Sequence, residues 1–170
     1  MPDPIADTLK ARFGEAIREA VEFRGETTIH VRPDAIVDVC TFLRDDPSAA
    51  YDFLSDVSAA DIWPDEPRFQ VNYHLYSMMH NQRLRLKVSV RDSQAVPSVT
   101  GVWPAANWFE RETYDLFGVK FDSHPDLRRL MLPDDYLGHP MRRDAPLVTE
   151  EVEFTYNFDE VEARKPYAKE

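Results

Sequence analysis

The chain contains very little cysteine and glycine. Its 170 residues include one cysteine, Cys40, and five glycines. One thiol cannot form an internal disulfide, a Cys-ligated iron–sulfur cluster or a Cys-rich zinc site, and it suits a reducing compartment. Neither a GxGxxG nor a GxxxxGKS/T loop occurs, which argues against the standard phosphate-binding loops of nucleotide-binding proteins. We expect Cys40 to be an inert core residue.

Long hydrophobic runs are also missing. The longest stretch without a charged residue, 93–109, is interrupted by prolines and is too short for a bilayer span of ~20 residues. The N-terminal residues show no basic segment followed by an apolar run, so we expect no secretory signal. We therefore expect that the chain does not cross a membrane.

Basic residues are outnumbered by acidic ones. The 20 lysines and arginines and the 31 aspartates and glutamates give a net charge of −11, which argues against a general nucleic-acid binder. The composition, 43% hydrophobic and 30% charged, is ordinary for a globular protein, and the length suits one domain with a short appendage. A chain of this length buries roughly 70% of its unfolded surface, so it needs no disulfide or metal to fold.

Hydrophobic periodicity predicts an α+β domain. The spacing of apolar residues over 5–21 predicts an amphipathic helix, and strict alternation over 69–76 and 83–90 predicts the two strands of an antiparallel hairpin. The other expected elements are a strand at 27–32, a helix opened by Pro33-Asp34, a weakly marked strand within 51–62, and a helix at 104–117 closed by Gly118. This order predicts helices on one face of a mainly antiparallel sheet. A ferredoxin-like arrangement is the first expectation, with other two-layer α+β arrangements open.

The character of the sequence changes after about Asp122. Prolines interrupt the following stretch, no periodicity is sustained, and residues 148–163 contain six acidic residues and no basic one. Apolar and aromatic residues persist there, in which a freely disordered tail would be depleted. We therefore divide the chain into an α+β domain, 1–122, and an extended, proline-rich tail, 123–170. The tail either docks on another molecule or folds back over its own sheet.

The densest set of polar residues lies at 110–118. On a helix, Glu112 falls inside a largely apolar stripe. A carboxylate on a packed face requires a cation or several hydrogen bonds, and the expected partner is Arg128, Arg129 or an arginine of another subunit. A catalytic interpretation would make Glu112 a general base with a raised pKa, but no nucleophile or metal set accompanies it.

A small metal-dependent hydrolase is an alternative of a different class. It would use His124 with the neighbouring carboxylates Asp122 and Asp126, and with Glu112, because two carboxylates and a histidine can bind a metal. However, the His-Pro order keeps the backbone extended, and no second histidine follows at i+4. A structural, hydrogen-bonding role therefore fits His124 better.

One strand carries the main group of basic residues, Arg83, Arg85 and Lys87, with Arg91 beyond its end. Such a face superficially resembles an RNA-binding sheet, which makes a small RNA-binding module another alternative. The outward residues provide no aromatic stacking platform, and the net charge is negative. A solvated face, or a salt-bridging surface for an acidic partner, fits this strand better.

One long run of residues is highly specific. It is Glu110-Arg111-Glu112-x-x-Asp115-Leu116-Phe117, then six residues, His124, three residues, and Arg128-x-Leu130-Met131. This run resembles the signature of the C-type subunit of the proton-pumping NADH:quinone oxidoreductase (respiratory complex I). The similarity is strong over 96–144 and looser over the preceding helices and strands.

The resemblance implies membership of the hydrophilic arm of that complex, which passes electrons from NADH through flavin and iron–sulfur clusters to quinone and couples this to proton translocation. It implies a chain without cofactors, since FMN, the clusters and quinone belong to partner subunits. The implied partners are the D-type quinone-site subunit, which helps form the quinone pocket, and the iron–sulfur subunits. The implied location is the cytoplasmic side of the inner membrane, or the matrix side in mitochondria, reached only through the complex. Similar subunits occur in membrane-bound hydrogenases and deazaflavin-dependent dehydrogenases, which stay open as alternatives.

From the same resemblance we predict a polar network at the junction of domain and tail, or at a subunit interface, with no catalytic, cofactor-binding or metal-binding residue. Its predicted members are Glu110, Arg111, Glu112, Asp115, Phe117, Gly118, His124, Pro125, Leu127, Arg128, Arg129 and Leu130.

Overall fold

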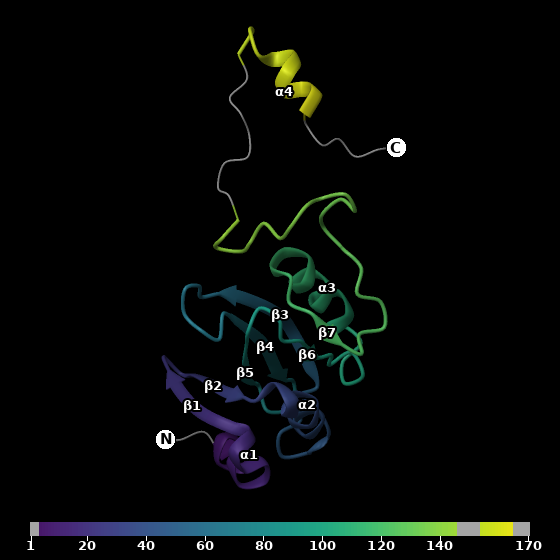
Figure 1. Cartoon of the computed structure of the whole chain (residues 1–170). Coiled ribbons are helices and arrows are strands. Elements are labelled where there is room, and N and C mark those ends of the chain that lie inside the picture. The colour runs from purple at the N-terminus through teal and green to yellow at the C-terminus, as the bar shows by residue number, and fades with distance from the viewer. Residues whose placement is uncertain (1–3, 146–153, 165–170) are drawn as a thin grey trace.

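A five-stranded sheet forms the centre of the protein (Figure 1), whose computed structural model describes residues 4–145 and 154–164. The strand order is β1-β2-β5-β4-β3. The parallel pair is β2 with β5, and the other neighbours are antiparallel. The strands are β1 (Ile17–Phe23), β2 (Glu26–Val31), β3 (Phe53–Asp61), β4 (Phe69–Ser77) and β5 (Gln82–Val90). The predicted α+β class with a mainly antiparallel sheet is confirmed.

Helices α1 (Pro4–Phe13), α2 (Ile36–Asp45) and α3 (Ala106–Phe117) complete the core on one side of this sheet, whereas the described side chains of α4 (Phe158–Arg164) contribute nothing to it. Alternate residues of β4 and β5 are buried, and they share one hydrophobic core with apolar residues of these three helices. The short 3-10 turns are η1 (Gly14–Ala16) and η2 (Pro33–Ala35). A separate small ladder joins β6 (Val96–Pro97) to β7 (Phe121–Asp122) in parallel. None of the helices in the described ranges is long and apolar enough to cross a membrane.

The N-terminal helix is shorter than predicted. The expected helix over 5–21 ends at Phe13, and its second half is the edge strand β1. Gly14 has a φ of +51°, a left-handed conformation that interrupts the helix. The hairpin turn at Arg24 and Gly25 has positive φ angles of 53° and 79° and aligns β1 with β2. Sheet pairing therefore overrides a spacing that also fits a helix.

The hairpin of β4 and β5 and the helix α3 follow the sequence closely. The antiparallel register pairs Phe69 with Val90 and Leu75 with Leu84, so all four apolar side chains lie on the buried face. Helix α3 ends at Gly118, whose φ of 79° is the left-handed cap that glycine favours. Both predictions are confirmed.

The chain from 123 to 145 has no regular structure and contacts α3 and one end of the sheet (Figure 1). The rest of the predicted tail falls partly outside the described residues, at 146–153 and 165–170. In the described remainder, residues 158–164 form α4.

Candidate functional site

The inner face of α3 carries two buried carboxyl groups, but Glu112 is not one of them. The buried residues of α3 are Ala106, Glu110, Thr113 and Asp115. Glu112 is only half-buried, because the packed face of α3 lies beside the stripe on which Glu112 was expected. The reason is that the packed face itself contains polar residues. The most apolar stripe in the sequence therefore lies beside the packed face of the helix and not on it.

Glu110 ties α3 to the turn that precedes it. Its fully buried carboxyl group accepts the backbone N–H of Val99 at 2.8 Å and lies 2.6 Å from the hydroxyl of Ser98. Burial raises the pKa of Glu110 to about 7, against the lowering effect of these two hydrogen bonds. The carboxyl group thus retains its proton at pH values well above the usual pKa of a glutamate.

His124 lies beside Glu110 with both ring nitrogens engaged. Nδ1 accepts the backbone N–H of Asp126 at 3.0 Å, so Nε2 carries the proton and faces the carbonyl oxygen of Asn107 at 3.2 Å. No lone pair of this tautomer is free for a metal, Asp122 is exposed, and Asp126 pairs with Arg128. Across residues 4–145 and 154–164, no group of three His, Cys, Asp or Glu side chains is placed to hold a metal ion.

Asp115 fixes the segment that follows β7. Its Oδ2 accepts three successive backbone N–H groups, those of residues 130, 131 and 132, at 3.0, 2.8 and 2.9 Å. Its Oδ1 accepts from Arg129 at 2.8 Å. Burial raises the pKa of Asp115, but these N–H groups and the guanidinium outweigh it and hold the pKa below its usual value. One buried carboxylate therefore determines the path of residues 129–132.

Two further contacts hold the same segment against α3. Arg111 donates to the carbonyl oxygens of Arg128 and Arg129 at 3.1 and 3.0 Å. His139 lies within 2.8 Å of the carbonyl oxygen of Asp115 through Nδ1, and its ring covers Gly118. A Cβ at position 118 would lie 2.6 Å from that ring, so this position needs glycine for space as well as for its φ.

The predicted network is thus assembled only in part. The structure brings Arg111, Asp115, Arg129 and the backbone of Leu130 into one cluster, and places Glu110 and His124 together in another. Leu127 and Phe117 pack against the hydrophobic core instead. Arg128 pairs with Asp126 at the surface, and Pro125 and Glu112 belong to neither cluster in the described contacts.

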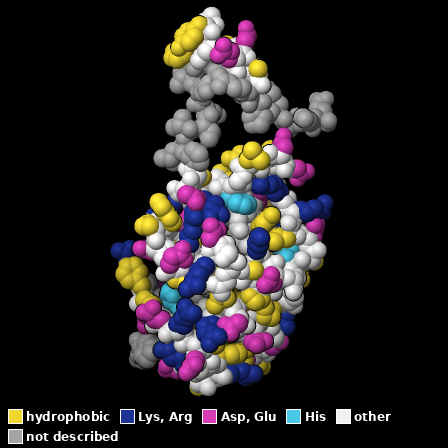
Figure 2. Space-filling model, in the orientation of Figure 1, with side chains coloured by type: hydrophobic (Ala, Val, Ile, Leu, Met, Phe, Trp, Pro, Cys, Tyr) yellow, Lys and Arg dark blue, Asp and Glu magenta, His cyan; other side chains and the backbone are white. Residues whose placement is uncertain are grey.

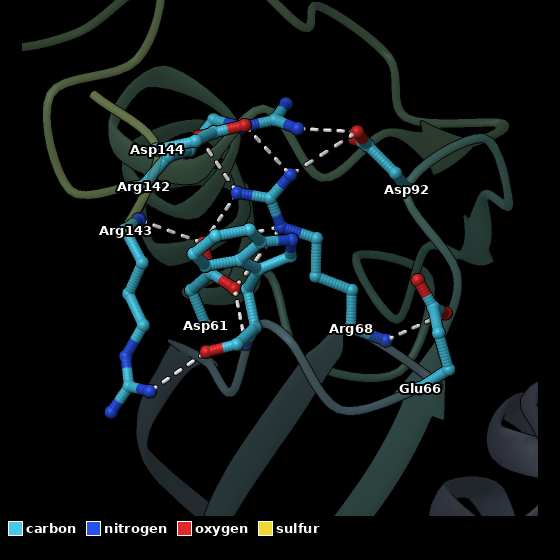
Figure 3. A network of polar contacts seen from close by, with 8 residues as sticks. Asp61, Glu66, Arg68, Asp92, Arg142, Arg143 and Asp144 are labelled. Atoms are coloured by element: carbon cyan, nitrogen blue, oxygen red, sulfur yellow. Dashed lines mark hydrogen bonds and ion pairs between the residues drawn. The ribbon is translucent and has the colours of Figure 1, made fainter. Parts of the chain in front are cut away.

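A second polar cluster, which sequence reasoning missed, surrounds Arg68, the residue directly before β4 (Figure 3). Its guanidinium donates to Asp61 at 2.7 Å and to both oxygens of Asp144 at 2.7 and 2.9 Å, and lies 3.6 Å from Asp92. Arg142 also contacts Asp92, and the backbone N–H of Arg143 donates to Asp61 at 2.8 Å. The cluster fastens residues 142–144 to the β3–β4 connection.

Asp61 and Arg68 form the buried centre of this cluster. Their side chains are 1% and 7% exposed. Burial raises the pKa of Asp61, but hydrogen bonds from Arg68, Arg143 and Trp63 prevail and lower it to about 2. The only hint in the sequence is the charged run at 142–144, which does not indicate its partners.

The outer face of the sheet is a surface of mixed charge. Figure 2 shows lysine and arginine side chains interspersed with acidic ones on the visible face. Arg85 pairs with Glu26 at 2.9 Å and donates to Thr28 at 3.1 Å. A hollow of about 590 Å³ opens on this face, lined among others by Phe53, His74 and Arg83. The basic strand face is thus partly neutralised within the chain.

Large apolar side chains project from the segment held by Asp115. Leu137 is 93% exposed, and Met131, Met141 and Tyr136 are exposed as well. Their backbone is fixed, yet their side chains face outward. Exposed apolar side chains gathered on one fixed segment are typical of an interaction surface.

The chain matches the family described as "Respiratory-chain NADH dehydrogenase, 30 Kd subunit" over residues 29–151. It is 48% identical over 167 residues to the C-type subunit of the NADH-quinone oxidoreductase of Roseiflexus sp. (strain RS-1), covering 98% of this chain and 96% of that protein. The same subunit of Roseiflexus castenholzii is 50% identical over 163 residues, covering 95% and 94%. That of Geobacter sulfurreducens is 48% identical over 141 residues, covering 82% and 86%.

Proposed function

The chain belongs to the family of the 30 kDa subunit of respiratory-chain NADH dehydrogenase, and from this premise we propose that it is a structural subunit of NADH-quinone oxidoreductase. In this role it holds neighbouring subunits in register and carries no redox group of its own. Those neighbours are the D-type quinone-site subunit, which helps form the quinone pocket, and the iron–sulfur subunits of the hydrophilic arm. The protein lies on the cytoplasmic side of the inner membrane, or on the matrix side in mitochondria, and reaches the membrane through the complex.

The observation that carries this proposal is the segment 129–141. Its backbone is fixed to α3 by Asp115, Arg111 and His139, while Leu137 and Met131 are exposed. A segment ordered before binding loses little conformational entropy when a partner covers it, so its apolar side chains contribute more of their burial energy to association. This is what a subunit that sets the position of its neighbours requires.

A rigid spacer also fits electron transfer in the complex. Tunnelling between clusters requires that their spacing stay fixed, and a subunit without a cofactor contributes by keeping the cluster-bearing and quinone-binding chains in place. We propose that residues 123–170 lie along these neighbours.

The test places a charge on the proposed docking segment. We expect Met131→Asp to lower the amount of assembled complex recovered by mild-detergent extraction, because the partner would have to bury a carboxylate without a counterion. Turnover per assembled complex should stay close to that of the wild type. The co-purifying chains also identify the complex: NADH-oxidising flavin subunits support the proposal, and hydrogenase or deazaflavin-dependent subunits would replace it.

The matched control is Met79→Asp. Met79 is 75% exposed, against 61% for Met131, but lies at the β4–β5 turn, away from the proposed docking segment. We expect this variant to assemble normally. Equal losses from both variants, or full assembly of Met131→Asp with poor turnover, would count against a docking role of this segment.

A further inference from the structure

The carboxyl group of Glu110 is sealed from solvent but connected to the surface by two hydroxyl groups. Its side chain is 0% exposed, and Oε2 lies 2.6 Å from the Oγ of Ser98. That Oγ lies 2.8 Å from the Oγ1 of Thr100. Ser98 and Thr100 are half-buried, and the next residue, Gly101, is exposed. A hydroxyl group can donate one hydrogen bond and accept two. The hydrogen bonds that link Thr100, Ser98 and Glu110 can therefore run either toward the carboxyl group or away from it.

We propose that Glu110 is a buried proton-binding site, loaded from the surface through the hydroxyl groups of Thr100 and Ser98. A proton from water binds to the oxygen of Thr100, whose own hydroxyl proton passes to Ser98, and the hydroxyl proton of Ser98 passes to Oε2 of Glu110. Each hydroxyl oxygen gains one O–H bond and loses one. The net change is the conversion of a carboxylate and a proton into a carboxylic acid, and release is the reverse.

His124 lies beside Glu110 but forms no hydrogen bond with it. Its Nδ1 accepts the backbone N–H of Asp126. Its Nε2 faces the carbonyl oxygen of Asn107 at 3.2 Å and lies 3.9 Å from Glu110 Oε2. Both ring nitrogens are therefore engaged by the backbone, and Ser98 is the side chain hydrogen-bonded to the Glu110 carboxyl group.

In the part of the chain that the structure describes, the other groups facing Glu110 include no cation that would keep its carboxyl group ionised. Cys40 of α2 and Tyr73 of β4 face Glu110, and burial raises the pKa of both, so they are neutral. Among residues 4–145, no lysine or arginine forms an ion pair with Glu110, in contrast to Asp115 and Asp61. A buried carboxyl group without a cation holds its proton tightly. The geometry therefore agrees with a pKa of about 7 for this group.

Proton occupancy changes the contacts of the turn before α3. The ionised carboxylate receives charge-assisted bonds from the Val99 N–H and the Ser98 hydroxyl, which are stronger than the bonds to the neutral acid. In the protonated state the acid donates to Ser98, and Ser98 donates onward to Thr100. The same atoms stay in contact, so the site can load and release a proton without a rearrangement of the backbone.

The direct test is a carbon-13 titration of the full chain labelled at the glutamate carboxyl carbons. We expect one resonance to titrate near pH 7 and to vanish in Glu110→Gln, while Glu112→Gln leaves it unchanged. If Glu110→Gln does not fold, through-bond correlation in the wild type assigns the resonance. A midpoint for Glu110 below pH 5, or no titration of its resonance between pH 4 and 9, overturns the proposal.

A second variant tests the path. Thr100→Val keeps the shape of the side chain and removes the outer hydroxyl without touching the Ser98–Glu110 contact. We expect a midpoint close to that of the wild type with slower exchange of the Glu110 proton, seen as broadening of the carboxyl resonance around the midpoint. Equal exchange rates in Thr100→Val and the wild type would reject the hydroxyl path.

Discussion

At the scale of the single residue, Asp115 makes the contacts that one substitution can disturb most. Its carboxylate accepts three backbone N–H groups and the guanidinium of Arg129. In Asp115→Asn an NH2 group replaces one of these oxygens and faces donors. We expect the free energy of unfolding to fall by about 2–3 kcal/mol, measured by urea unfolding. The amide protons of residues 130–132 should also exchange faster with solvent.

The matched control for this prediction is Asp126→Asn. Asp126 also pairs with an arginine, but that arginine, Arg128, has a side chain that is 77% exposed. Surface ion pairs contribute little, so this variant should remain close to the wild type. If both variants lost the same stability, or neither did, the backbone of residues 130–132 would not depend on Asp115.

At the scale of the element, Arg68 joins a strand end to a segment distant in the sequence. It contacts Asp61, seven residues away, and Asp144, 76 residues away. Arg68→Met keeps the bulk of the side chain but leaves the carboxylate of Asp61 buried without a counterion. We expect a loss of about 3–5 kcal/mol in the free energy of unfolding, measured by urea unfolding. Limited proteolysis should begin near residues 142–144, because their anchor is gone.

Two further variants separate the ion pair from a general effect of arginine loss. Arg32→Met removes a surface arginine that pairs with its neighbour Asp34, and should have little effect. The double variant Arg68→Met with Asp61→Asn removes the buried charge and should recover part of the stability. A double variant as unstable as Arg68→Met alone would show that the charge of Asp61 is not the cause.

The same scale explains which elements the sequence could predict. Strands β4 and β5 and helices α2 and α3 follow from local periodicity and from Pro33 and Gly118. Strand β1 does not, because its apolar spacing also fits a helix and its pairing with β2 depends on the turn at residues 24–25. The sequence does contain one sign that the helix ends early, namely Gly14, after which the residue pattern changes.

The candidate site was less predictable than the fold. The resemblance identified the region 110–130, but the prediction that Glu112 lies on the packed face of α3 was wrong, because that face contains polar residues. Asp115 and Arg129 are 14 residues apart in the sequence, and Arg68 and Asp144 are 76 residues apart. Sequence spacing carries no information on such contacts when at least one partner lies outside the regular periodic elements.

At the scale of the whole molecule, the carboxyl groups whose pKa changes on folding divide the pH dependence of stability into two ranges. The pKa values of Asp61, Asp115 and Asp144 are lowered on folding, so their contribution is present above the ordinary value of 3.8 and is lost as the pH falls below it, for Asp61 toward about 2. Glu110 acts in the opposite sense. Its pKa rises from 4.5 to about 7, so its contribution is complete below pH 4.5 and is lost as the pH rises to about 7.

A comparison of Glu110→Gln with the wild type isolates the contribution of Glu110 to the pH dependence of stability. The histidines His30 and His74 have lowered pKa values and favour folding as the pH rises through 6.5, which masks the effect of Glu110 in the wild type alone. They are unchanged in Glu110→Gln, so they cancel in the difference between the two proteins. Because glutamine cannot ionise, we expect the variant to gain about 3 kcal/mol relative to the wild type between pH 4.5 and 8, measured by urea unfolding at each pH.

The conservative substitution makes this difference interpretable. The amide oxygen of glutamine can still accept the N–H of Val99, and its NH2 can donate to Ser98, so both contacts of the protonated acid survive. Glu112→Gln, two residues along the helix and only half-buried, should show the pH dependence of the wild type. If Glu110→Gln also followed the wild type across this range, Glu110 would be ionised at neutral pH, and a buried carboxylate without a cation would have to be stabilised by two hydrogen bonds alone.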